Sequence, residues 1–114
     1  MKLKHMETAA LKAESLEICG ILANTDSPER VFAFLRDMLS EKEIVEFSRR
    51  FKVAKMLSEG VSYAAIETET GMSSATIARV SKFLTGEFGG YRDAISTLQS
   101  VTDKHHSGHR PRSV

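Results

Sequence analysis

The sequence predicts an all-α fold, and three observations carry this prediction. Apolar residues recur at helical spacing along almost the whole chain, and no segment shows the strict apolar–polar alternation of a strand between hairpin turns. Turn-forming residues, above all Gly60, Gly71 and Gly89-Gly90, divide the chain into segments of helical length. With 114 residues, 41% apolar and 27% charged, the chain is typical of one soluble globular domain, or of a subunit whose core a partner completes.

Two helices are expected in the N-terminal third. Apolar residues follow a helical repeat from about residue 4 to 22, and turn-forming residues at 24–28 interrupt it. Ser27 followed by Pro28 is typical of a helix start, because serine caps free amide hydrogens and proline tolerates the first helical position. The second helix then extends to about Met38.

A third helix, which we expect to carry the core, is predicted over residues 40–60. Ser40 and Glu43 match the capping-box pattern, in which a hydroxyl and a carboxylate each accept a hydrogen bond from a free backbone amide. The apolar residues that follow recur every three or four positions, as in a buried stripe. They are Ile44, Phe47, Phe51, Ala54 and Leu57. Gly60 then ends the helix.

The segment 62–84 predicts a helix-turn-helix, a motif of many proteins that bind duplex DNA. Gly71 stands where the chain must reverse, since glycine enters the left-handed conformation without a side-chain penalty. Ser73 or Ser74 supplies the oxygen that caps the second helix. Four apolar residues are expected to hold the two helices together. They are Ile66, Met72, Ile77 and Val80.

The outward face of the second motif helix combines small and hydroxyl side chains with two cations. Such side chains permit close approach to a major groove, accept bridging waters and reach phosphates. We therefore expect this face, together with the start of the first motif helix, to contact DNA. The candidate DNA-binding residues are Ser62, Tyr63, Ser73, Ser74, Ala75, Thr76, Ala78, Arg79 and Lys82.

A helix-glycine-helix hairpin also occurs in all-α proteins that bind no nucleic acid. Two residues depart from the generic motif, since Glu67 replaces a small residue and Thr70 a large apolar one. The competing hypothesis is a helical protein–protein interaction module that uses Glu67 and Glu69 as contacts. The net charge of +1 decides nothing between the two, because any phosphate-binding surface would be local.

A last helix is predicted over residues 90–99, after glycines interrupt the helical pattern. Residues 102–114 contain three histidines, three cationic residues and a proline with almost nothing to bury, so we expect them to form a disordered tail. Its local positive charge would add, at most, non-specific affinity for DNA. Residues 1–101 are then expected to form a single helical domain.

The sequence gives little support to catalysis or metal binding. Cys19 is the only cysteine, and we expect it to pack in the core rather than act as a nucleophile. His105, His106 and His109 could ligate a metal, but without a cysteine or carboxylate cluster they would form a poor site. No phosphate-binding loop or catalytic triad is recognisable, and no apolar run approaches the ~20 residues that span a bilayer. We expect a cytoplasmic protein that is not an enzyme, with no cofactor, metal site or membrane anchor.

The chain contains the runs Leu39-Ser-Glu-Lys-Glu43 and Arg50-Phe-Lys-Val-Ala-Lys-Met-Leu57, then Gly60, the two-helix unit 62–84 and Gly89-Gly90-Tyr91. With these spaced features the chain resembles the Trp repressor family, in particular its YerC/YecD branch, over about residues 30–98. The resemblance implies a Trp-repressor-like helical bundle. In it, N-terminal helices, here residues 1–38, intertwine with those of a second copy and leave one DNA-reading head at each end of a homodimer.

The composition of residues 1–38 agrees with that implication. These helices are rich in leucine, isoleucine, phenylalanine and valine, which a thin single-chain bundle would struggle to bury. A two-fold dimer would present two recognition helices, so we expect double-stranded DNA with a near-palindromic operator. Its half-sites would lie about one duplex turn, ~34 Å, apart.

In Trp repressors, two arginines and groups of the recognition helix hold the corepressor tryptophan. The resemblance assigns the arginines to Arg50 and Arg79 and the threonine beside the ligand to Thr76. The glycine that leaves room for the indole is Val80 here, and the serine that holds the amino group is Phe83. We expect these two side chains to fill the ligand's space, and we predict a regulator that does not respond to tryptophan. Any other small-molecule effector is unknown.

The two arginines also have a structural explanation. Glu46 or Glu67 could hold Arg50 and Arg79 as ion pairs, or the arginines could bind phosphate. On this alternative neither arginine belongs to an effector site.

Overall fold

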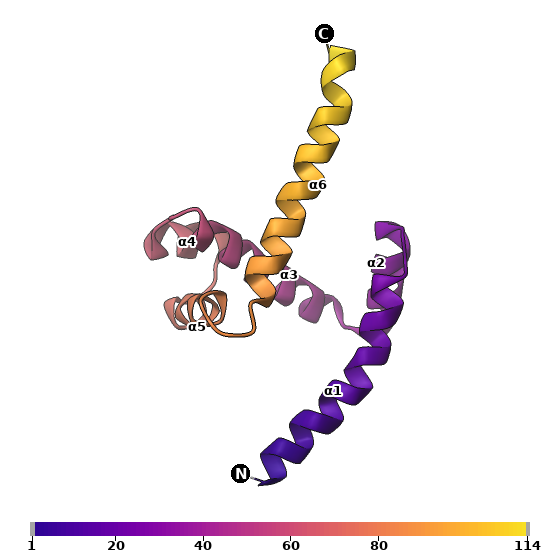
Figure 1. Ribbon diagram of the computed structural model, residues 1–114. Helices are drawn as coiled ribbons and strands as arrows, with labels where there is room; N and C mark the ends of the chain where they lie inside the picture. The colour runs from indigo at the N-terminus through magenta and orange to yellow at the C-terminus, as the bar shows by residue number, and fades with distance from the viewer. Residues whose placement is uncertain (1, 114) are drawn as a thin grey trace. The chain divides into compact units, whose positions relative to one another are not determined.

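The computed structural model describes residues 2–113, with the side chains of residues 12–101. Within that part the chain forms six α-helices and no strand, so the predicted all-α fold is confirmed (Figure 1). The chain divides into two units, Met1–Ile44 and Val45–Val114, and each is described by itself. The helices are α1 (Lys2–Ala23), α2 (Pro28–Met38), α3 (Glu41–Ser58), α4 (Tyr63–Thr70), α5 (Ser74–Leu84) and α6 (Gly90–Ser113).

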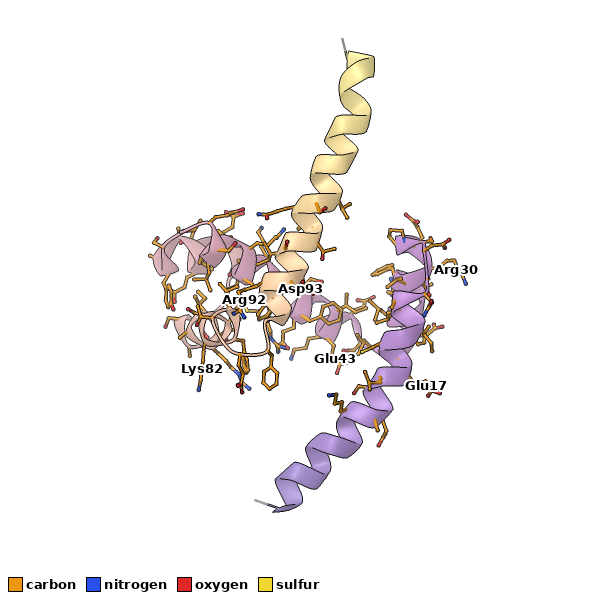
Figure 2. All side chains as sticks on the ribbon, in the orientation of Figure 1. Glu17, Arg30, Glu43, Lys82, Arg92 and Asp93 are labelled. Carbon is orange, nitrogen blue, oxygen red and sulfur yellow. The ribbon has the colours of Figure 1, made fainter. Side chains whose placement is uncertain are left out.

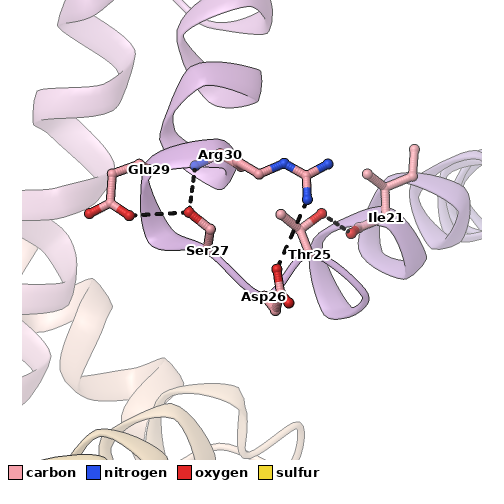
Figure 3. A network of polar contacts seen from close by, with 6 residues as sticks. All are labelled: Ile21, Thr25, Asp26, Ser27, Glu29 and Arg30. Atoms are coloured by element: carbon pink, nitrogen blue, oxygen red, sulfur yellow. Dashed lines mark hydrogen bonds and ion pairs between the residues drawn. The ribbon is translucent and has the colours of Figure 1, made fainter.

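In the first unit, polar side chains hold the turn between α1 and α2 (Figure 3). At the end of α1 the Ile21 carbonyl accepts two hydrogen bonds, from the Thr25 hydroxyl at 2.7 Å and from the Asn24 amide at 3.2 Å. Ser27 caps α2, because its Oγ accepts a hydrogen bond from the Arg30 amide at 3.3 Å. With Pro28 at the first position, the start of α2 is the one predicted from the sequence.

The predicted capping box at the start of α3 is confirmed. The Ser40 amide donates to Glu43 Oε1 at 2.8 Å, and the Glu43 amide donates to Ser40 Oγ at 3.1 Å. These reciprocal bonds satisfy two backbone donors that the helix itself leaves without partners.

Among the described side chains of the first unit, residues 12–44, none is buried. Leu16 is 56% exposed and Phe32 is 48% exposed. Cys19 is also exposed, so the prediction that it packs in a core is wrong for the single chain. The reason is that the first unit buries none of its described side chains, so it offers no core in which Cys19 could pack.

The hydrophobic core belongs to the second unit, where residues of α3, α4, α5 and α6 converge. Its buried members are Val53, Ala54, Ile66, Ile77, Val80 and Ile95. Full burial of a valine or isoleucine stabilises the fold by about 1.5–3 kcal/mol relative to exposure. In Figure 1 α4 and α5 lie side by side and α6 begins next to α5, consistent with their contacts.

The turn between α4 and α5 forms as predicted. Gly71 has φ 73° in the left-handed region, and its amide donates to the Glu67 carbonyl at 2.9 Å. Thr70, which departs from the generic motif, is buried with its hydrogen bonds satisfied. Its hydroxyl donates to the Ile66 carbonyl at 2.7 Å and accepts from the Met72 amide at 3.2 Å. Thr70 therefore stabilises this turn through its hydrogen bonds, although it is not the apolar residue of the generic motif.

Helix α6 continues to Ser113, whereas the sequence predicted an end near residue 99. No glycine or proline occurs from Tyr91 to Ser107, so this stretch contains no helix-breaking residue. The side chains of residues 102–113 and the whole of residue 114 lie outside the described part. The disordered tail at 102–114 and the single domain at 1–101 accordingly stay predictions.

None of the helices, as far as the described residues go, combines the length and apolar character that a membrane span requires.

The capping box predicts how Glu43 titrates. The pKa of its carboxyl lies below the ordinary value of 4.5, first because it accepts a hydrogen bond from the Ser40 backbone and second through the Ser40 side chain. Since the folded pKa is the lower one, this contribution to stability is present above the unfolded pKa and is lost as pH falls through the folded pKa. An NMR titration of the Glu43 carboxyl should give a midpoint below 4.5. Ser40→Ala should raise that midpoint, and an unchanged midpoint in this variant would contradict the assignment.

Candidate nucleic-acid interface

Two serines fix the starts of α4 and α5. Ser62 Oγ accepts from the Ala65 amide at 3.2 Å, and Ser73 Oγ accepts from the Thr76 amide at 3.2 Å. Of the two serines considered for the second cap, Ser73 is the one that serves. Ser73 also donates to Thr76 Oγ1 at 3.1 Å. Ser62 and Ser73, both predicted to contact DNA, therefore already have structural roles as helix caps.

The two faces of α5 differ sharply in burial. Ile77 and Val80 point into the core, whereas Ala75 and Ala78 are exposed. Because an α-helix has 3.6 residues per turn, a residue two positions from a buried one is rotated by about 200° around the axis. The exposed alanines consequently lie on the side of α5 that is opposite to its buried anchors.

The remaining candidate residues of α5 flank this row of alanines. Ser74, Arg79 and Lys82 are exposed, and Thr76 is half-buried. Figure 2 labels Lys82 on α5. Tyr63, at the start of α4, is also exposed. The structure thus brings an accessible row of small side chains together with two cations on one short helix.

The acidic residues of α4 are accessible as well. Glu67 is exposed, so a carboxylate at this position disturbs no packed helix crossing. Glu69 forms an ion pair with Lys52 of α3 at 3.3 Å. An exposed pair of this kind contributes about 0–1 kcal/mol, so the core rather than this ion pair holds α4 in place.

Arg50, Thr76 and Arg79, the residues that the resemblance assigns to an effector site, meet at one cavity. The cavity has a volume of about 270 Å³, and Val80, Phe83 and Tyr91 complete its lining. The expectation that Val80 and Phe83 fill this space is wrong. Val80 packs in the core, and Phe83 is 49% exposed, so both line the cavity without closing it.

Tyr91 is a member of this lining that the sequence analysis missed as a site residue. A loop with two glycines, Gly86 and Gly89, separates it from α5, so its approach to Phe83 depends on how α6 packs on α5. The run Gly89-Gly90-Tyr91 was the available signal, because two adjacent glycines permit a sharp change of direction before an aromatic residue.

One of the two arginines has the carboxylate partner that the structural alternative predicted. Arg50 lies 3.7 Å from Glu46, one helical turn earlier on α3. For Arg79, no ion pair forms with any residue in the described part of the chain. Arg79 thus keeps its guanidinium available at the border between the cavity and the outward face of α5.

Metal ligands do not gather in the described residues, where no group of three histidine, cysteine, aspartate or glutamate side chains is placed to hold an ion. The side chains of His105, His106 and His109 lie outside the described part. A role of these three residues in metal binding stays untested.

In this all-helical chain, α4 and α5 are joined by a glycine in the left-handed conformation, and α5 carries an exposed row of small residues. This arrangement is that of a helix-turn-helix protein. The chain belongs to the Trp repressor family, because the model of that family, described as Trp repressor protein, matches residues 14–99. The predicted resemblance is therefore confirmed.

Two relatives are informative. The chain is 38% identical to the "Uncharacterized protein YerC" of Bacillus subtilis (strain 168) over 73 residues, which are 64% of this chain and 70% of YerC. It is 36% identical to a TrpR-like protein of Eubacterium eligens ATCC 27750, whose crystal structure aligns with a TM-score of 0.67 over 77% of this chain and 90% of that one.

The lining of the cavity predicts that tryptophan does not bind. Val80 and Phe83 stand where Trp repressors have a glycine and a serine, and Phe83 offers the ammonium of an amino acid no hydrogen-bond acceptor. Calorimetry with millimolar tryptophan should show no saturable heat. Phe83→Ser, which supplies a hydroxyl acceptor, should bind tryptophan more tightly than the wild type. A micromolar dissociation constant for the wild type would refute this prediction.

Proposed function

We propose that this protein is a homodimeric transcriptional regulator that binds double-stranded DNA in a sequence-specific manner and does not respond to tryptophan. Membership of the Trp repressor family, a family of regulators rather than enzymes, supports the class. The observation that carries the proposal is the outward face of α5, where Ala75 and Ala78 are exposed directly opposite buried anchors. We place this regulator in the cytoplasm, the location expected from the sequence.

The chemistry of this face suits a major groove. Alanine methyl groups allow the helix backbone to approach base edges, and they can contact thymine methyl groups. Ser74 is exposed for direct or water-bridged hydrogen bonds at the N-terminal end of α5. Arg79 and Lys82 lie further along the helix, where cations can reach phosphates that flank the groove.

Exposed apolar side chains support the homodimer. No described side chain of the first unit is buried, although Leu16, Ile21 and Phe32 are large and apolar. The second unit adds Phe88, which is 87% exposed, and Val101 on α6. Apolar surface of this extent is typical of an interface between subunits, and a second copy with intertwined N-terminal helices would cover it.

A dimer would also compensate for the small number of cations on the α4–α5 unit of one subunit. Each head offers Arg79 and Lys82 on α5, so two heads double the number of phosphate contacts from this helix. Two-fold symmetry further predicts a near-palindromic operator with half-sites about one duplex turn, ~34 Å, apart.

The cavity beside α5 is suited to an anionic ligand. Arg50 and Arg79 present two positive groups, and the Thr76 hydroxyl adds a donor or acceptor between them. An anion bound there would contact the same helix that we propose to read DNA.

The alternative function is a helical protein–protein interaction module that uses the acidic residues of α4. Glu67 is exposed and could serve it, whereas Glu69 is already paired with Lys52. Selection of bound sequences from a random duplex pool by the purified protein separates the two functions. A regulator should enrich a near-palindromic sequence, whereas a protein-binding module should enrich none.

Contact between α5 and the groove predicts a clear effect of one substitution. Ala78→Glu places a bulky anion on the exposed face and should abolish operator binding, by at least about a hundredfold, since clash and phosphate repulsion act together. Helical content measured by circular dichroism should not change, because Ala78 is exposed. Gln99→Glu, which adds the same charge on α6, is the matched control and should bind like the wild type. Retained binding by Ala78→Glu would mean that α5 does not enter a groove.

Salt dependence identifies the phosphate contacts. The logarithm of the binding constant should fall linearly with the logarithm of salt concentration, with a slope of about −0.9 for each neutralised phosphate. Arg79→Ala and Lys82→Ala should each reduce the magnitude of this slope by about 0.9 for each head that binds. Lys42→Ala, at an exposed lysine outside the two-helix head, should leave it unchanged. If neither α5 variant altered the slope, these two residues would not be phosphate contacts.

A further inference from the structure

One arginine ties the C-terminal end of α5 to the start of α6. Arg92 Nη1 donates to the Leu84 carbonyl at 2.7 Å and to the Gly86 carbonyl at 2.9 Å. Figure 2 shows Arg92 at the base of α6, beside the loop that comes from α5. Although Arg92 itself is exposed, a single guanidinium nitrogen thereby joins three consecutive parts of the second unit.

The carbonyl of Leu84 needs a partner from outside its helix. The last carbonyls of an α-helix have no intrahelical donor, and together they carry the negative end of the helix dipole. Loop amides satisfy two of them, since Thr85 donates to Ser81 at 3.2 Å and Gly86 donates to Phe83 at 3.1 Å. Arg92 supplies the donor for Leu84 together with a positive charge. It therefore adds to the cap of α5 from a neighbouring helix.

Two glycines make room for this arrangement. A Cβ on Gly89 would lie 3.0 Å from Arg92 Nη2, and Gly89 also has φ 71°, which disfavours other residues. A Cβ on Gly86 would lie 3.1 Å from the Lys82 carbonyl, so the loop could not approach the end of α5 as closely. The loop sequence thus permits the close contact that the guanidinium makes.

We infer that Arg92 is a positioning residue for DNA binding, which holds the C-terminal half of α5 in the orientation that the groove requires. This inference rests on the proposed function. Arg79 and Lys82, the proposed phosphate contacts, lie in the last two turns of α5, next to the carbonyls that Arg92 holds. Val80 and Ile95 anchor α5 and α6 to the same core, and Arg92 adds the polar contact at the open end of this pair. Because α5 is then held at both its core face and its C-terminal end, Arg79 and Lys82 keep a fixed orientation relative to the groove.

The test compares Arg92→Ala with Arg92→Lys in operator binding across a range of salt concentrations. Arg92→Ala should weaken binding by about three- to tenfold, as expected for loss of charge-assisted hydrogen bonds, with the salt slope unchanged because Arg92 neutralises no phosphate. Arg92→Lys keeps the charge but not the guanidinium geometry, and it should recover part of the affinity. A slope reduced by about 0.9 per head would make Arg92 a phosphate contact, and unchanged affinity would make it structural only. Either result would overturn the inference.

A measurement without DNA keeps this test independent of the proposed function. In Arg92→Ala, hydrogen exchange at the amides of Thr85 and Gly86 should be at least about threefold faster, because the end of α5 opens more often. Gly89→Ala should have the same effect, whereas Gly60→Ala, with φ 81° and open space around it, controls for backbone strain alone. Unchanged exchange in Arg92→Ala would refute the role of Arg92 in capping α5. If the wild type bound no duplex while exchange still accelerated, the proposed function would fall and the cap on α5 would stand.

Discussion

The burial of Ile77 and Val80 is the interaction on which the rest of this structure depends. These two side chains, one helical turn apart, seat α5 on a core that α3, α4 and α6 share. At about 1.5–3 kcal/mol for each fully buried side chain, they outweigh the exposed ion pairs and single caps nearby. Because helix geometry rotates neighbours two positions away by about 200°, the same burial turns Ala75 and Ala78 outward. The exposed face of α5 that carries Ala75 and Ala78 is therefore a consequence of the core.

Local signals in the sequence were sufficient to predict the helix boundaries that short-range chemistry determines. Ser27 with Pro28, Ser40 with Glu43, and Gly71 all act within four residues, and the structure confirms each of them. The features that the sequence did not reveal depend on packing between helices. Arg92 reaches carbonyls six and eight residues earlier only because α6 folds back on α5, and Tyr91 joins the cavity for the same reason. No periodicity encodes such contacts.

The cavity lined by Arg50, Thr76 and Arg79 shows the same limit in another way. The family resemblance placed Arg50, Thr76 and Arg79 at one site, and these three residues do line one cavity. It also led us to expect that Val80 and Phe83 would fill the space beside them, which they do not. Val80 turns toward the core and Phe83 toward solvent, so a cavity of about 270 Å³ persists. Its lining differs from the tryptophan site of Trp repressors at Val80 and Phe83, which replace a glycine and a serine. The positive charges of Arg50 and Arg79 favour an anionic group at this cavity.

Mapping of backbone amide NMR shifts during titration with duplex DNA shows directly whether the outward face of α5 contacts paired bases. If it does, the largest shifts occur from Ser73 to Lys82, with smaller ones at Ser62 and Tyr63, which cap and begin α4. Shifts confined to the acidic residues of α4, or the absence of any shift at Ala75 and Ala78 while DNA is bound, would contradict it.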